Sequence, residues 1–120
     1  MNNISRNLNL PLLIGAFKNS LDGLLHALKS ERAFQQEVVL LAVGSIAAFL
    51  LTDTGLERAV LIGSIAMVLI VELLNSAIEA TVDRIGSEIH PLSKNAKDLG
   101  SAAVLISLLS AATMWLIILV

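Results

Sequence analysis

The sequence predicts an all-α membrane protein in which an N-terminal amphipathic surface helix is followed by three transmembrane helices. Hydrophobic residues make up 56% of the chain, and charged residues make up only 15%. The charges are also clustered, so that the stretches 38–51, 59–71 and 99–120 carry none. A water-soluble domain has more charge and distributes it more evenly, whereas uncharged apolar stretches approaching about 20 residues are typical of membrane spans.

We expect one domain with a surface helix over 8–29 and transmembrane helices over 31–52, 55–85 and 92–120. In the surface helix over 8–29, apolar residues recur at steps of three and four, with polar residues between them. This periodicity indicates a helix lying flat on the cytoplasmic membrane surface, and the alternative is a helix packed on protein. The residues that carry the pattern are Leu13, Phe17, Leu21, Leu24, Leu25 and Leu28.

Short local signals predict where the helices begin and end. Ser30 could cap the helix that follows it. Thr54 and Glu57 have the spacing of a capping box before the next helix. Gly86 is a plausible end for that helix, and Pro91 suits the first turn of the last one.

Lysine and arginine residues predict the orientation in the membrane. They cluster before the first span and between the second and third, whereas the turn over 52–58 has one. Because basic loops stay in the cytoplasm, we expect a cytoplasmic N-terminus and an outward-facing C-terminus. The residues behind this assignment are Arg6, Lys18, Lys29, Arg32, Arg84, Lys94 and Lys97, against Arg58 in the turn.

The composition also excludes several classes of site. The chain has no cysteine and a net charge of −2. Disulfides and thiolate metal sites are therefore excluded, and nothing indicates nucleic-acid binding. With His26 and His90 as the only imidazoles, a zinc site is disfavoured, and a metal held by oxygen atoms, such as magnesium, is favoured.

A polar stripe on the helix over 55–85 carries the strongest functional signal. Glu72, Asn75, Glu79 and Asp83 are separated by three, four and four residues, so they share one helix face. The stripe is expected to pass from the hydrocarbon core into the cytosol. Burying Glu72 in the membrane is costly and therefore indicates a function, with a helix-packing contact as the alternative.

A second polar cluster lies at the cytoplasmic entry to the last span, where Lys97 and Asp98 are level with Glu79. Glu31 starts the first span on the same side. Glu31, Glu79 and Asp98 could therefore approach one another and hold a cation. Acidic oxygens beside lysines, without thiols, suit phosphoryl transfer, which needs a magnesium clamp, a positive group and a base.

Three segments resemble the bacterial integral-membrane diacylglycerol kinase family, in its Gram-negative form. They are ERAFQQE at 31–37, VELLNSAIEATVDRIGSE at 71–88 and HPLSKNAKDLGSAA at 90–103. The resemblance extends from about residue 12 to the C-terminus. It implies a homotrimer with sites shared between subunits, and Mg²⁺-dependent transfer of the ATP γ-phosphate to the primary hydroxyl of diacylglycerol, a membrane lipid, giving phosphatidic acid.

The resemblance also implies roles for individual residues. Glu72 would be the general base and would contact the lipid, and partial burial suits a carboxylate to accepting a proton. Asn75 and Asp83 would support the site. The metal ligands would be Glu31 and Glu79. The ATP-binding residues would be Glu31, Glu79, Glu88, Ile89, His90, Lys97 and Asp98, and the lipid site would be bordered by Ala33, Phe34, Gln35, Gln36, Glu37 and Ser101.

The sequence departs from the family pattern at Leu12, where a basic residue is common, and at Asn19, where an aromatic residue is common. No role is carried over to these two positions. A related branch resembles undecaprenol kinase, which stays an alternative. A small proton-coupled transporter using Glu72 is a further alternative, as is a structural assembly subunit, but a transporter needs polar groups through the full membrane depth.

Overall fold

The computed structural model describes residues 9–120, which are almost entirely helical. The elements are α2 (Leu10–Ser30), α3 (Arg32–Leu51), α4 (Gly55–Ile85) and α5 (Pro91–Leu119). The all-α prediction is confirmed, and each helix begins and ends within about two residues of the expected positions. The chain forms two compact units, one ending at Glu31 and the other spanning Arg32–Val120.

Helix α2 is the helix that the structure describes in the first unit, and Arg6, one of the basic residues behind the predicted orientation, lies outside the described residues. At its start, the Asn9 side chain accepts a hydrogen bond from the Leu12 backbone N–H at 3.4 Å. Its C-cap is Glu31, whose N–H donates to the Ala27 carbonyl at 2.9 Å. The expectation that Ser30 caps the following helix is therefore wrong, because the α2 hydrogen-bond ladder continues through Ser30. The apolar side chains of the predicted stripe, including Phe17 and Leu25, are exposed.

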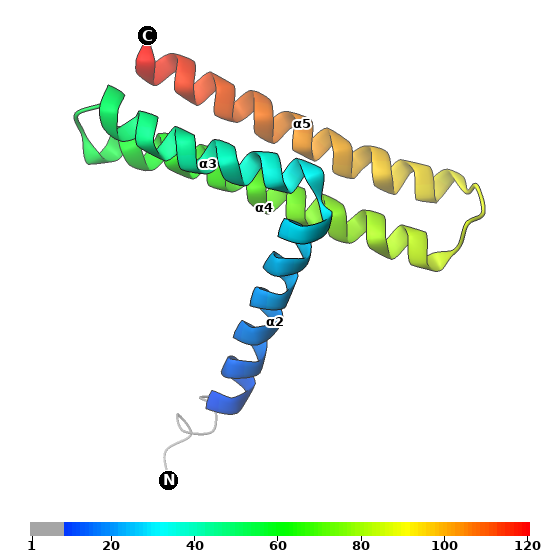
Figure 1. Cartoon of the computed structure of the whole chain (residues 1–120). Coiled ribbons are helices and arrows are strands. Elements are labelled where there is room, and N and C mark those ends of the chain that lie inside the picture. Colours follow the sequence, from blue (N-terminus) through cyan, green and yellow to red (C-terminus); the bar gives the residue numbers. More distant parts are fainter. Residues whose placement is uncertain (1–8) are drawn as a thin grey trace. The chain divides into compact units, whose positions relative to one another are not determined.

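The second unit is built from α3, α4 and α5, with α4 packed against both of its neighbours. Figure 1 shows these helices running alongside one another, with the α3–α4 turn and the α4–α5 loop at opposite ends. All three are long and apolar enough to cross a membrane. The polar loop and the α3–α4 turn therefore belong to opposite membrane faces if each helix spans the bilayer.

The ends of α4 and α5 follow the local signals of the sequence. Thr54 Oγ1 accepts a hydrogen bond from the Glu57 N–H at 3.2 Å, and Gly86 is the C-cap of α4. Pro91 lies in the first turn of α5, where His90 Nδ1 accepts from the Leu92 N–H at 3.1 Å. These predicted boundaries are confirmed.

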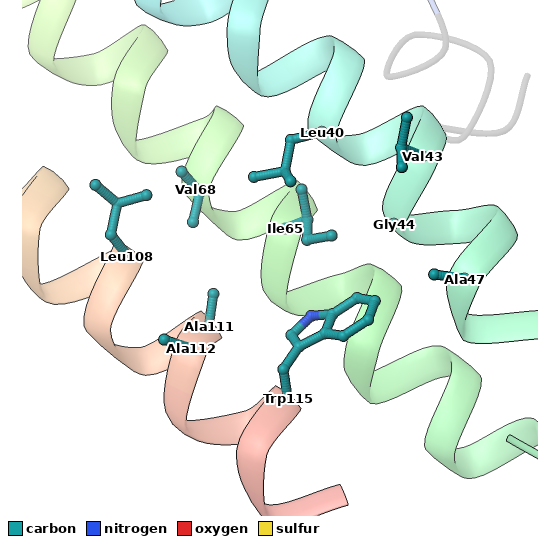
Figure 2. A pocket seen from close by; sticks show the side chains of 10 residues that line it. All are labelled: Leu40, Val43, Gly44, Ala47, Ile65, Val68, Leu108, Ala111, Ala112 and Trp115. Carbon is teal, nitrogen blue, oxygen red and sulfur yellow. The ribbon is translucent and has the colours of Figure 1, made fainter. Parts of the chain in front are cut away.

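Close packing holds the apolar half of the second unit together. Gly44 of α3 lies so near α4 that an added Cβ would overlap the Ile65 side chain, and it would also contact the Trp115 indole at 3.5 Å. Trp115 Nε1 donates a hydrogen bond to Ser64 Oγ at 3.1 Å. Figure 2 shows the Trp115 side chain beside an apolar groove of about 390 Å³ that α3, α4 and α5 line together.

Candidate functional site

The polar stripe on α4 changes from buried to exposed along the helix. Glu72 and Asn75 are 7% and 8% exposed, Glu79 is half-buried, and Asp83 is exposed. Glu72 and Asp83 are separated by about 16 Å along the helix axis, at 1.5 Å per residue. One helix thus joins a buried acid to the polar end of the bundle.

Glu37 of α3 lies opposite Glu72 of α4. The two helices are antiparallel, and Gly44 contacts Ile65 across them. Glu37 precedes Gly44 by seven residues, and Glu72 follows Ile65 by seven, so both acids lie two turns from that contact on the same faces. Both are buried. Within the described part of the chain, Glu37 Oε2 has no hydrogen-bond partner.

Asn75 connects the buried part of the stripe to Glu79. Its Nδ2 donates a hydrogen bond to Glu79 Oε1 at 3.3 Å. On the other side, the amide oxygen of Asn75 lies against Gly100 of α5, where an added Cβ would overlap it. The amide is therefore held between two helices, with its donor group directed at the carboxylate.

The end of α4, the following loop and the first turns of α5 surround one polar hollow of about 350 Å³. Asp83 lies in the last turn of α4, and Lys97 of α5 forms an ion pair with it. A hollow of this size is in the range of small-ligand sites. The five residues expected at ATP outside the metal site all line it, and they are Glu88, Ile89, His90, Lys97 and Asp98.

Two ion pairs set the charge pattern of this hollow. Lys97 Nζ lies 2.6 Å from Asp83 Oδ1, which joins α5 to α4. Lys94 Nζ lies 2.5 Å from Asp98 Oδ2 within α5. All four side chains are well exposed to solvent, so these pairs add little to stability. Their effect is to place two ammonium groups beside the hollow, which the carboxylates of Asp83, Glu88 and Asp98 also line.

A cation site made of three acids is not found in the residues that the structure describes. Asp98, which we expected as a third ligand, is paired with Lys94 instead, and Glu31 belongs to the other unit. Glu79 accepts a hydrogen bond on Oε1, which leaves Oε2 as a carboxylate oxygen for a metal. This donor set fits Mg²⁺, which binds one or two carboxylates together with water and substrate phosphates rather than a protein cage.

The residues expected to border the lipid do not share one helix face. Phe34 and Glu37 are buried, whereas Ala33, Gln35 and Gln36 are exposed. A run of five consecutive residues winds around a helix, so this division is unavoidable. Ser101 is also exposed, on α5 next to Gly100.

Sequence reasoning missed two features of this region. From the sequence, Lys94 indicates only the membrane orientation, yet Lys94 lines the hollow and pairs with Asp98. The spacing of four residues between them is a readable signal for such a pair. The close contact of Gly100 with Asn75 was also missed, because nothing in the sequence indicates which residue a helical glycine meets.

Comparisons with known proteins identify the family of the chain. Residues 18–119 match the family described as prokaryotic diacylglycerol kinase. The chain is 51% identical to a diacylglycerol kinase of Pseudomonas aeruginosa over 107 residues, which cover 89% of this chain and 87% of the relative. It is 50% identical to one of Escherichia coli (89% and 88% covered) and 46% identical to one of Haemophilus influenzae (86% and 87% covered). This integral-membrane chain therefore belongs to the prokaryotic diacylglycerol kinase family.

Proposed function

We propose that the chain transfers the γ-phosphate of ATP to the primary hydroxyl of diacylglycerol, giving phosphatidic acid and ADP. One observation carries the proposal: on α4, one polar stripe begins at a buried carboxylate, Glu72, and ends at Asp83, which lines a polar hollow together with two lysines. Lipid and nucleotide differ greatly in polarity. An enzyme that joins them therefore needs a helix that leads from an apolar region to a polar one. The names of the relatives point to the same lipid.

Glu72 is the proposed general base. As the hydroxyl oxygen of the lipid attacks the γ-phosphorus, the carboxylate takes the hydroxyl proton. The bond from the γ-phosphorus to the β,γ-bridging oxygen breaks, and ADP leaves with the electron pair. The proton then passes from Glu72 to water. Burial of Glu72 keeps this exchange away from bulk solvent, so that water competes less as an acceptor.

ATP is proposed to bind at the polar hollow with its phosphates directed along α4 towards Glu79. Lys97, paired with Asp83, offers a positive group at a fixed position. Glu79 would hold Mg²⁺ together with the phosphates, and the metal would neutralise charge that develops on the transferred group. Asn75 keeps the Glu79 carboxylate in place through its hydrogen bond.

The complete site is proposed to form between subunits of a homotrimer. The residues that the structure describes in one chain contain no group of three metal-binding side chains, and Glu31 lies in a separate unit from Glu79. A metal site that uses both acids can therefore draw them from two chains. We also propose a bacterial inner-membrane location with the polar hollow, and thus the nucleotide, on the cytoplasmic face.

The test offers the purified chain ATP labelled in the γ-phosphate, with diacylglycerol and undecaprenol supplied in separate reactions. We expect label in phosphatidic acid and little in undecaprenyl phosphate. Label in undecaprenyl phosphate alone would assign the other lipid, and no transfer to either would reject the kinase proposal. Cross-linking in the membrane checks the trimer, and recovery of monomers alone would contradict it.

A further inference from the structure

Gly100 is placed where no larger residue fits without displacing part of the site. It is buried on α5 at the closest approach to α4. A Cβ at this position would overlap Asn75 Oδ1 and would lie 3.7 Å from Ile78 Cδ1. The absence of a side chain at Gly100 therefore creates the space that the Asn75 amide occupies.

The Asn75 amide has its oxygen on the Gly100 side and its nitrogen on the Glu79 side. Asn75 Oδ1 is buried and has no N–H or O–H donor among residues 9–120, and the hydrogen atoms on the Gly100 Cα are its neighbours across the interface. Such a Cα–H group is a weak donor to an oxygen. The amide nitrogen is then directed to Glu79 Oε1, at 3.3 Å. The reverse orientation would bring two acceptor oxygens together.

We propose that Gly100 is a positioning residue for the metal-binding carboxylate, acting through Asn75 on Glu79. The inference rests on the proposed function, in which Glu79 holds Mg²⁺ with ATP. Groups that fix the orientation of a metal ligand from behind commonly change metal affinity by about tenfold or more when they are lost. Gly100 has this effect without touching the metal, because it leaves room for the Asn75 amide beside Glu79.

Other glycines of the second unit provide matched controls. Gly44 is packed as closely as Gly100, but an added Cβ there meets the apolar side chains of Ile65 and Trp115. Gly63 has nothing within 4 Å of an added Cβ. Gly44→Ala thus tests the cost of crowding two helices far from the stripe. Gly63→Ala tests the effect of the alanine alone, which is favourable within a helix.

The experiment measures Mg²⁺ dependence in two ways for Gly100→Ala, Gly44→Ala and Gly63→Ala. The first is the Mg²⁺ concentration that gives half-maximal lipid phosphorylation at fixed ATP. The second, which needs no turnover, is the rise in unfolding temperature that Mg²⁺ with a non-hydrolysable ATP analogue gives to the detergent-solubilised protein. We expect Gly100→Ala to raise the half-maximal Mg²⁺ concentration about tenfold and to reduce the temperature rise. Gly44→Ala should lower the unfolding temperature with an unchanged Mg²⁺ requirement, and Gly63→Ala should leave the Mg²⁺ requirement unchanged without lowering the unfolding temperature.

Asn75→Leu keeps the test decisive if Gly100→Ala does not fold. Leucine has nearly the shape of asparagine but lacks the donor, so it should reproduce the raised Mg²⁺ requirement with the glycine in place. Glu79→Gln separates the two proposals. If Glu79→Gln shifts the Mg²⁺ requirement but Asn75→Leu and any folded Gly100→Ala protein do not, the role of Gly100 is wrong. If Glu79→Gln itself causes no shift, the metal assignment of Glu79 fails, and the role of Gly100 fails with it.

Discussion

Glu37 and Glu72 occupy matching positions on two antiparallel helices, each two turns from the contact of Gly44 with Ile65. Both side chains are less than one-tenth exposed. Burial disfavours the charged form of each carboxylate, and two charged carboxylates at facing positions also repel each other. The second unit therefore carries a local instability at the place where the proposed base lies.

The first prediction concerns that repulsion. Glu37→Gln keeps the size of the side chain and removes one charge, so we expect the free energy of unfolding to rise by about 1–2 kcal/mol near neutral pH. The gain should fade as the pH falls, because protonated carboxyl groups do not repel each other. Thermal unfolding in detergent across a pH series measures it. A loss of stability at neutral pH would show that Glu37 is held by a favourable contact instead.

The second prediction tests Glu72 as the general base. Glu72→Gln should retain the helical circular-dichroism spectrum and an unfolding temperature no lower than that of the parent. Lipid phosphorylation should fall by about 10²–10⁴-fold, the usual contribution of a general base. Glu57→Gln, at the other end of the same helix, is the control and should keep full activity. Normal phosphorylation by the Glu72 variant would exclude this residue as the base.

The sequence was sufficient to predict those features that depend on one helix. The burial gradient from Glu72 to Asp83 follows from periodicity and from the length of the apolar stretch before it. The ends at Thr54 and Gly86 follow from local hydrogen bonding. Ser30 does not cap the following helix, because the backbone hydrogen bonds of α2 continue past Ser30 to the Glu31 N–H.

Features that depend on two helices could not be predicted. Which residue Gly100 meets is decided by the register of α5 on α4, and periodicity within α5 says nothing about that register. The pairing of Glu37 with Glu72 depends in the same way on how α3 aligns with α4. We expected Asp98 to approach Glu79, but Asp98 forms an ion pair with Lys94, one turn away on the same helix.

The third prediction concerns the ion pair between Lys97 and Asp83. The two side chains are 43% and 66% exposed, so Asp83→Asn should change the free energy of unfolding by less than about 1 kcal/mol. The released lysine would no longer be held at the hollow, and we expect the KM for MgATP to rise several-fold with kcat little changed. Steady-state kinetics at two salt concentrations measure this effect. Arg84→Ala alters the charge beside Asp83 outside the hollow and should leave KM unchanged, whereas a lower KM in Asp83→Asn would mean that the aspartate repels the nucleotide.

The last prediction concerns Ser64 and Trp115 in the apolar half of the bundle. Ser64 Oγ donates to the Leu61 carbonyl at 2.7 Å and accepts from Trp115 Nε1 at 3.1 Å, so its hydroxyl is fully used in packing. Ser64→Ala leaves the indole N–H without its partner and should lower the free energy of unfolding by about 0.5–2 kcal/mol. Trp115→Phe should lower it further, because it also removes contacts along the groove.

Lipid phosphorylation by the folded fraction should stay normal in both variants, because Ser64 lies about 12 Å from Glu72 along the helix. A proton pathway through the membrane would need a polar group at this depth, and Ser64 is the polar residue that 59–71 provides. Loss of the hydrogen bond to Trp115 lowers stability under either hypothesis. The transporter alternative also predicts loss of function in the folded Ser64→Ala protein, whereas the kinase predicts normal phosphorylation by it, so assaying activity and unfolding on the same preparations distinguishes the two.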